Sequence, residues 1–205
     1  MSHDVPVIHI VDDDPSVGLS IARLLESVGY RATAFPSGQE YLTSDDCGLA
    51  SCVILDMRMP QMSGLQLQEE LLRRYPEIAI VFLTGFGTIP MTVNAIRAGA
   101  VDCLEKPFSE PQLLESVNLA IAKYKLSCNK LHEQVELRNR LKSLTSRERE
   151  VFALVVQGMT NKKIGIELFI SEKTVKIHRG RVMEKMYADS LPALVRMADI
   201  LIPSA

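Results

Sequence analysis

The sequence predicts a doubly wound α/β domain followed by a smaller, all-α helix-turn-helix domain. Short apolar, β-branched segments alternate five times with helical patterns through residues 5–124, which is typical of a parallel sheet covered by helices. After residue 143 the pattern changes to short helices that begin at Ser or Thr caps. The charge changes as well: residues 1–122 contain 7 Lys and Arg against 16 Asp and Glu, whereas residues 123–205 contain 16 against 9.

Five near-continuous apolar segments are the expected strands, because strands covered on both faces do not alternate with polar residues. They span residues 5–11, 31–35, 52–57, 78–84 and 101–106. The expected helices span residues 16–28, 38–44, 64–75, 89–99 and 110–124. Asp14 and Pro15 have the residue types of a helix N-cap and a first helical position, so the first helix should start directly after the first strand.

Five polar residues lie where predicted strands end: Asp12, Asp13, Asp56, Thr84 and Lys106. In open parallel sheets, functional groups collect beyond the carboxyl ends of the strands. Each residue alone has an ordinary explanation, since Asp favours turns and caps, Thr favours strands, and most lysines are solvated. Their common position at one edge of the sheet favours a shared site.

This set of side chains suits phosphoryl chemistry. Carboxylates at the ends of the first and third strands can converge on one cation, and oxygen ligands completed by water suit Mg²⁺. Asp56 would then be a nucleophile toward phosphorus, while Mg²⁺ and the Lys106 ammonium neutralise the phosphoryl oxygens. A phosphohydrolase would use the same groups, but that enzyme reading leaves the basic, helical half of the chain unexplained.

Residues 123–143 contain no Gly or Pro and continue the helical pattern, which predicts a helical connector. The expected division is therefore a domain of residues 1–122, a linker of residues 123–143 and a domain of residues 144–205. Thr145 and Glu148 form a capping box at the start of the last domain. Further helix caps are expected at Thr160, Ser171 and Ser190, and the short link before Ser171 has the length that a helix-turn-helix requires.

The cysteines and the hydropathy pattern exclude several other classes. Four scattered cysteines lack metal-ligand spacing or a disulfide framework, which favours reduced thiols. No segment has the length and apolar character of a membrane span, and the N-terminal residues lack the pattern of a secretory signal. We expect a cytoplasmic protein with no membrane partner.

Residues 5–122 resemble a bacterial two-component receiver domain, which has a flavodoxin-like fold. The matching segments are VDDD (11–14), LDMRMPQMSG (55–64), FLTG (82–85) and EKPF (105–108). By this resemblance Asp56 is the phospho-acceptor. The resemblance also implies Mg²⁺ as cofactor, with ligands Asp12, Asp13, Asp56 and the backbone carbonyl of Arg58.

The same resemblance implies a switch that senses the phosphoryl group. Thr84 and Lys106 are its expected members, and the peptide bond before Pro107 is expected to be cis. Receivers usually have Tyr or Phe three residues before the lysine, and this chain has Cys103 instead. We therefore expect Thr84 and the loop after it to move, without the usual aromatic rotation.

Residues 144–202 resemble the helix-turn-helix output domain of LuxR/FixJ-type regulators, with matches at LTSREREV, GMTNKKI, LFISEKTVKIHR and DSLPALVRMA. The recognition helix should span about residues 171–186, with Val175, Val182 and Met186 on its buried face. Exposed side chains of this helix and of the preceding helix start are expected to contact DNA. The candidate DNA-binding residues are Thr160, Asn161, Lys162, Lys163, Lys173, Thr174, Lys176, Ile177, His178, Gly180 and Arg181.

Gly180 is unusual because glycine within a helix costs roughly 1 kcal/mol relative to Ala. Either close approach to DNA excludes a side chain there, or the position tolerates glycine. For His178, packing and phosphate contact remain alternatives.

Taken over its whole length, the chain resembles a FixJ-type response regulator, which is not a turnover enzyme. The resemblance implies phosphorylation by a sensor histidine kinase, homodimerisation on phosphorylation, and binding to promoter DNA to regulate, and more specifically to activate, transcription with RNA polymerase. A regulator that binds DNA independently of phosphorylation is the alternative.

Overall fold

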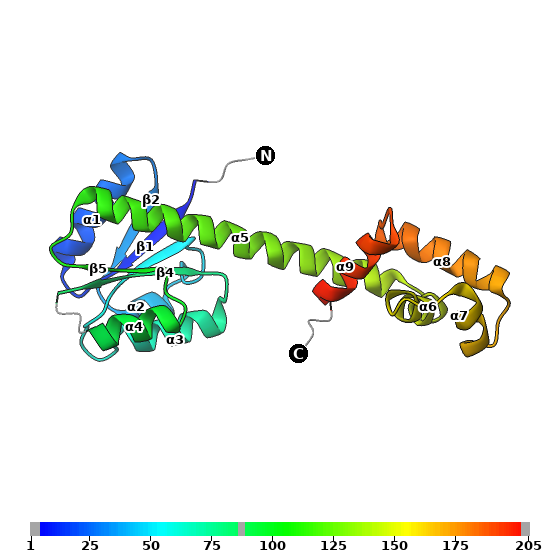
Figure 1. Cartoon of the computed structure of the whole chain (residues 1–205). Coiled ribbons are helices and arrows are strands. Elements are labelled where there is room, and N and C mark those ends of the chain that lie inside the picture. Colours follow the sequence, from blue (N-terminus) through cyan, green and yellow to red (C-terminus); the bar gives the residue numbers. More distant parts are fainter. Residues whose placement is uncertain (1–4, 86–88, 202–205) are drawn as a thin grey trace. The chain divides into compact units, whose positions relative to one another are not determined.

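The computed structural model describes residues 5–85 and 89–201 and divides into two compact units, with the boundary between Cys128 and Asn129 (Figure 1). The first unit contains β1 (Val7–Val11), α1 (Pro15–Ser27), β2 (Arg31–Phe35), α2 (Gly38–Thr43), β3 (Cys52–Asp56), α3 (Gly64–Arg74), β4 (Ala79–Thr84), α4 (Ile89–Arg97), β5 (Asp102–Glu105) and the first part of α5 (Glu110–Ser143). The strands form one parallel sheet in the order β2-β1-β3-β4-β5. The predicted doubly wound fold is confirmed.

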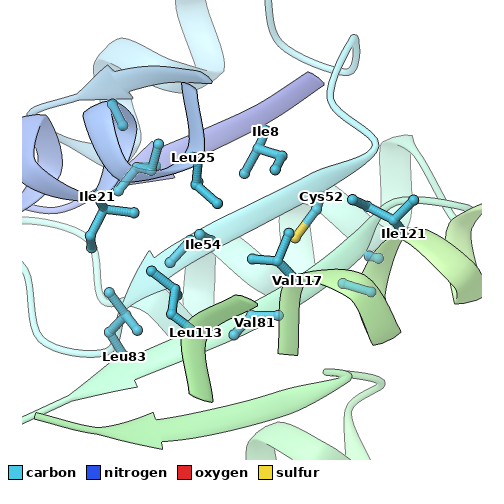
Figure 2. Packing of buried hydrophobic residues seen from close by; sticks show 14 residues of the cluster. Ile8, Ile21, Leu25, Cys52, Ile54, Val81, Leu83, Leu113, Val117 and Ile121 are labelled. Atoms are coloured by element: carbon cyan, nitrogen blue, oxygen red, sulfur yellow. The ribbon is translucent and has the colours of Figure 1, made fainter. Parts of the chain in front are cut away.

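Helices cover both faces of this sheet, and each face has its own apolar core. On one face, α1 and α5 pack against the strands through residues such as Leu25 and Val117 (Figure 2). On the other face, α2, α3 and α4 contribute residues such as Tyr41, Leu67 and Ala95. Burial on both faces explains why the central strands read as unbroken apolar segments.

The outer strands differ from the central ones. All residues of β3 and β4 are buried, whereas β2 and β5 are only partly covered because they form the edges of the sheet. The predicted strands extend one or two residues beyond the observed ones at several ends, where pairing with the neighbouring strand stops. Asp14 caps α1 by accepting the backbone N–H of Ser16, with Pro15 in the first helical position, as predicted.

Helix α5 continues without interruption from Glu110 to Ser143. The helical state predicted for residues 123–143 is therefore confirmed. Its first half packs on the sheet through Leu113, Val117 and Ile121, and its last turns pack within the second unit through Leu137 and Leu141.

The second unit continues with α6 (Ser146–Val156), α7 (Asn161–Glu167), α8 (Glu172–Met186) and α9 (Leu191–Leu201). Thr145 and Glu148 form the predicted capping box of α6, and Thr160 and Ser171 cap α7 and α8. The Ser190 hydroxyl accepts the N–H of Ala193 at the start of α9. These four caps, all predicted from Ser and Thr positions, determine where the helices begin.

The turn between α7 and α8 depends on Gly165. The backbone N–H of Ile170 donates to the Gly165 carbonyl at 2.9 Å, and a Cβ on Gly165 would lie 2.8 Å from the Ile170 carbonyl oxygen. Phe169 reverses the chain with a φ of 55°. The short link therefore requires glycine because two backbones touch, and it forms the tight turn that the sequence predicts.

An ion pair joins α6 to α8. Lys185 Nζ donates to Glu148 Oε2 at 2.6 Å, and Glu148 is a buried residue whose carboxylate also accepts the N–H of Thr145. The hydrogen bond from Lys185, followed by the one from the Thr145 backbone, lowers the pKa of Glu148 to about 2. The carboxylate thus fixes α8 against the capped start of α6.

Among residues 5–85 and 89–201, no helix combines the length and the apolar character needed to cross a membrane. Helix α5 is long enough but is polar along most of its length.

Replacement of Glu148 by Gln should destabilise the helical unit at neutral pH and much less at low pH. A carboxyl group with a lowered folded pKa stabilises the fold above its unfolded pKa of 4.5, and this contribution is lost as pH falls toward about 2. We expect the melting temperature of Glu148→Gln to fall by roughly 4–8 °C at pH 7, the effect of about 1 kcal/mol. The difference from the wild type should shrink at pH 3.

Thermal unfolding followed by circular dichroism at both pH values measures this effect. Glu184→Gln is the matched control because Glu184 is an exposed residue of α8. If the melting temperature of Glu148→Gln lay equally far below that of the wild type at pH 7 and at pH 3, the role given to the ionised carboxylate would be wrong.

Candidate functional site

The predicted polar residues lie together at the carboxyl edge of the sheet. β3 pairs with both β1 and β4, which brings the end of β3 at Asp56 between the other two strand ends. The N–H of Lys106 donates to the Thr84 carbonyl at 2.7 Å, so the residue after β5 lies beside the end of β4. The chain reverses its winding direction between β1 and β3, which is where ligand sites form in such sheets.

The centre of this site is a bridge formed by Lys106 between Asp12 and Asp56. Lys106 Nζ donates to Asp12 Oδ2 and to Asp56 Oδ1, each at 2.7 Å. The side chains are 1% exposed for Asp12, 10% for Asp56 and 25% for Lys106. Two buried carboxylates so close to each other require a cation, and the ammonium of Lys106 supplies it.

Backbone groups orient both carboxylates. The N–H of Asp14 donates to Asp12 Oδ1 at 2.9 Å, and the N–H of Arg58 donates to Asp56 Oδ2 at 2.7 Å. Each carboxylate therefore uses one oxygen for its own loop and the other for Lys106. Partial burial acts to lower the pKa of Lys106, but the hydrogen bonds and charges of the two aspartates outweigh it, so the pKa is raised.

Thr84 supplies a buried hydroxyl that lacks a partner. Its Oγ1 is inaccessible to solvent and has no hydrogen-bond partner among the described residues. An unsatisfied buried hydroxyl at the end of β4 is ready to bind a group that enters the site. This fits the predicted sensing role of Thr84.

Gly64 is a site residue whose role the sequence reasoning did not assign. It is the first residue of α3, and its N–H donates to the Met57 carbonyl at 3.2 Å. A Cβ on Gly64 would lie 2.3 Å from the Asp56 carbonyl oxygen, so any side chain here would displace the strand end that holds Asp56. The available signal was a glycine directly after the helix cap Ser63.

The predicted metal ligands stay a prediction. The described residues contain no group of three or more acidic, histidine or cysteine side chains that could hold a metal ion. Asp12 and Asp56 share Lys106, whereas Asp13 is exposed in the loop after β1 and the structure does not bring it into a three-carboxylate cluster. The donors near Lys106 are all oxygens, which is the kind of set that Mg²⁺ prefers.

The peptide bond after Lys106 and Cys103, three residues before it, also bear on the predictions. The Lys106–Pro107 peptide bond is cis, the isomer that the resemblance implies. Cys103 lies half-buried on β5, with its Sγ 3.8 Å from the Thr92 hydroxyl of α4. Burial raises the pKa of the Cys103 thiol, so it remains protonated and acts as a small apolar group.

The second candidate site is the exposed face of α8. Val175, Val182 and Met186 are fully buried in the core of the helical unit, as predicted. The predicted DNA-contacting residues of the opposite face are exposed: Lys173, Lys176, Ile177, Gly180 and Arg181. Lys162 and Lys163 are exposed at the start of α7, the helix that packs against α8.

Several other predicted DNA residues have structural contacts of their own. The Thr160 and Thr174 backbones and side chains take part in the caps of α7 and α8. Asn161 Oδ1 accepts a hydrogen bond from Arg179 at 3.0 Å, which joins the two helices. His178 is half-buried and its Nδ1 is enclosed without a partner among the described residues, so packing accounts for part of its position.

Gly180 lies in open space. A Cβ built on it would meet no atom of the chain within 4 Å. Packing within the domain therefore does not require glycine at this position.

Comparison with known proteins identifies two families in the chain. The response regulator receiver domain family matches residues 8–118, and the family described as bacterial regulatory proteins, luxR family, matches residues 142–198. Nodulation protein W from Bradyrhizobium diazoefficiens is 42% identical over 195 residues, which cover 95% of this chain and 86% of that protein. The transcriptional regulatory protein FixJ from Azorhizobium caulinodans is 39% identical, with 97% and 93% covered.

Solved structures of response regulators are also similar to this chain. The structure of the response regulator StyR has a TM-score of 0.79 and 39% identity, covering 95% of this chain and 98% of that one. Full-length FixJ from B. japonicum has a TM-score of 0.57 and 35% identity, with 96% and 97% covered. The chain therefore belongs to the response regulators that combine a receiver domain with a LuxR-type helix-turn-helix domain, the family that includes FixJ.

Proposed function

We propose that this response regulator is phosphorylated on Asp56 by a partner histidine kinase, dimerises, and then binds promoter DNA to activate transcription. The observation that favours Asp56 is the difference in exposure within the Lys106 bridge: Asp12 is 1% exposed and Asp56 is 10% exposed. The side chain of Asp56 is therefore the more accessible of the two to a phosphoryl donor. Asp56 also lies between the ends of β1 and β4, so groups from several loops surround it.

The proposed step is an in-line transfer. An oxygen of Asp56 attacks phosphorus while the bond from phosphorus to the histidine nitrogen of the kinase breaks, which leaves an acyl phosphate on Asp56. Lys106 keeps its positive charge through the reaction because its pKa is raised by Asp12 and Asp56. The Lys106 ammonium can then bind a phosphoryl oxygen. Its hydrogen bond to Asp56 Oδ1 would be replaced by one to the phosphoryl group.

Mg²⁺ is the proposed cofactor. Its ligands would be Asp12, Asp13, Asp56 and the Arg58 carbonyl. When bound, it would neutralise charge that develops on the phosphoryl oxygens. The oxygen-only donor set supports this choice, and the exposed position of Asp13 allows it to turn toward the site.

The acyl phosphate would act through Thr84. The unsatisfied hydroxyl of Thr84 can donate to a phosphoryl oxygen, which draws the end of β4 toward Asp56. The loop predicted to move includes residues 86–88, which lie outside the described residues. In α4, which follows them, Val93 and Ile96 are 39% and 43% exposed. These apolar side chains, together with β5, form the face that we propose pairs in the phosphorylated dimer.

A dimer would place two α8 helices on adjacent half-sites of promoter DNA. Residues 144–205 have a net charge of only about +3, counted from 10 Lys and Arg against 7 Asp and Glu, so one copy alone should bind weakly. Two copies on a two-fold site combine their contacts. RNA polymerase is the expected partner of the bound dimer.

Replacement of Asp56 by Asn should abolish covalent labelling by a small acyl-phosphate donor. Asn keeps the shape and the hydrogen bond from the Arg58 N–H but cannot form an acyl phosphate. We expect about one phosphoryl group per wild-type chain and none on Asp56→Asn, measured by intact-protein mass spectrometry. Chelation of divalent metal should abolish the labelling of the wild type.

Asp45→Asn is the matched control, because Asp45 is exposed and lies after α2. Stoichiometric labelling of Asp56→Asn would overturn the assignment. Repeated turnover of a simple phosphoester by the wild type would favour the phosphohydrolase reading instead.

Alanine variants on the exposed face of α8 should distinguish residues that contact phosphate from residues that contact bases. Lys176→Ala and Arg181→Ala should each weaken binding to a target promoter and reduce the slope of log affinity against log salt by about 1 if the lost contact is to phosphate. Ile177→Ala should weaken binding to the target by about 1 kcal/mol without changing that slope. Fluorescence anisotropy at several salt concentrations measures both quantities.

Arg196→Ala, which removes an exposed charge from α9, is the control for general electrostatics. The surface assignment would be wrong if Arg196→Ala weakened binding as much as Arg181→Ala.

A further inference from the structure

Gln68 is a buried polar side chain between α3 and α4. It is 1% exposed, and its Nε2 donates to the Ala95 carbonyl of α4 at 3.1 Å. Ala95 is fully buried in the apolar core on that face of the sheet. The bond therefore joins two neighbouring helices inside a site that water does not reach.

Only one end of the Gln68 amide has a partner. Oε1 is buried and has no hydrogen-bond partner among the described residues. Rotating the amide by half a turn would place Oε1 against the Ala95 oxygen, and two acceptors repel each other. The orientation is thus fixed by Ala95, and the other end of the amide lacks a partner in this arrangement.

The helix itself does not need this bond. The Ala95 carbonyl already accepts the N–H of Ala100 at 3.0 Å, which closes the end of α4. What Gln68 adds is a fixed position of α4 relative to α3. Breaking this bond with the amide still buried would leave Nε2 without a partner as well as Oε1, so the bond favours the present position of α4.

A second polar contact joins the same helix to the sheet. The Thr92 hydroxyl lies 3.8 Å from Cys103 Sγ of β5, where receivers usually have an aromatic ring. Helix α4 therefore has one polar contact to α3, through Gln68, and one to β5, through Cys103. Its exposed residues Val93 and Ile96 belong to the face that the proposed dimer uses.

We propose that Gln68 is a latch that holds α4 in the unphosphorylated position and releases it when Asp56 is phosphorylated. This inference rests on the proposed function, in which the end of β4 moves toward Asp56. The bond to Ala95 exists only while α4 keeps its present register against α3. It therefore favours one of the two arrangements, which is the requirement for a switch element.

The test compares DNA affinity with and without an acyl-phosphate donor for wild type and Gln68→Met. Met has a similar volume but neither donates nor accepts the hydrogen bonds of the amide. We expect the unphosphorylated variant to bind promoter DNA roughly three to ten times more tightly than unphosphorylated wild type, the factor expected for one lost hydrogen bond. Affinities of the phosphorylated proteins should agree within about twofold.

Gln39→Met is the matched control, because Gln39 is exposed on α2. Gln68→Leu is the second variant if Gln68→Met does not fold by circular dichroism. Leu also lacks a donor for the Ala95 carbonyl and should release α4 to a similar extent. Equal affinities of wild type and variant in both states, or equal changes in both states, would overturn the latch.

The same titration distinguishes failure of the proposed function from failure of the latch. A wild type that does not respond to the donor contradicts the proposed function. A wild type that responds, with an unphosphorylated Gln68→Met that binds no more tightly, contradicts the latch alone.

Discussion

The structure of the first unit depends on one electrostatic requirement at the carboxyl edge of its sheet. Asp12 and Asp56 are both buried and negatively charged, and neither could be held there without a cation between them. Lys106 provides it at 2.7 Å from each carboxylate, while backbone N–H groups bind the remaining oxygens. The strand order brings the three residues together, and the close contact of Gly64 with the Asp56 carbonyl keeps the end of β3 in place.

This arrangement explains how a local covalent change could have distant effects. A phosphoryl group on Asp56 would alter the partner of Lys106 and offer an acceptor to the unsatisfied Thr84 hydroxyl, so two neighbouring strand ends would respond to one event. Helix α4, which follows Thr84 in the chain, makes polar contacts to α3 through Gln68 and to β5 through Thr92, besides the apolar packing of Ala95. A gain at Thr84 that outweighs the two polar contacts would shift the population of α4 positions.

Much of this was predictable from the sequence, and the limits have physical causes. Strand ends, helix caps and the alternation of apolar segments are local signals, so the fold and the positions of Asp12, Asp56, Thr84 and Lys106 followed from them. Side-chain pairing across elements is not local: the Lys106 bridge, the half-satisfied Gln68 and the pairing of Arg179 with Asn161 depend on how separate helices and strands pack. The predicted role of Asp13 as a metal ligand stays a prediction, because a loop side chain such as the exposed Asp13 has no neighbours among the described residues that fix its direction.

The central claim is that phosphorylation of Asp56 controls DNA binding by the helical unit. A gel-shift titration of the full chain on a target promoter, with and without an acyl-phosphate donor and Mg²⁺, tests it most directly. The account predicts at least a tenfold rise in affinity with the donor, equivalent to about 1.4 kcal/mol, together with a shift from monomer to dimer. Identical affinities in the two conditions, with Asp56 shown to be fully phosphorylated in one of them, would contradict it and favour a regulator that binds DNA independently of phosphorylation.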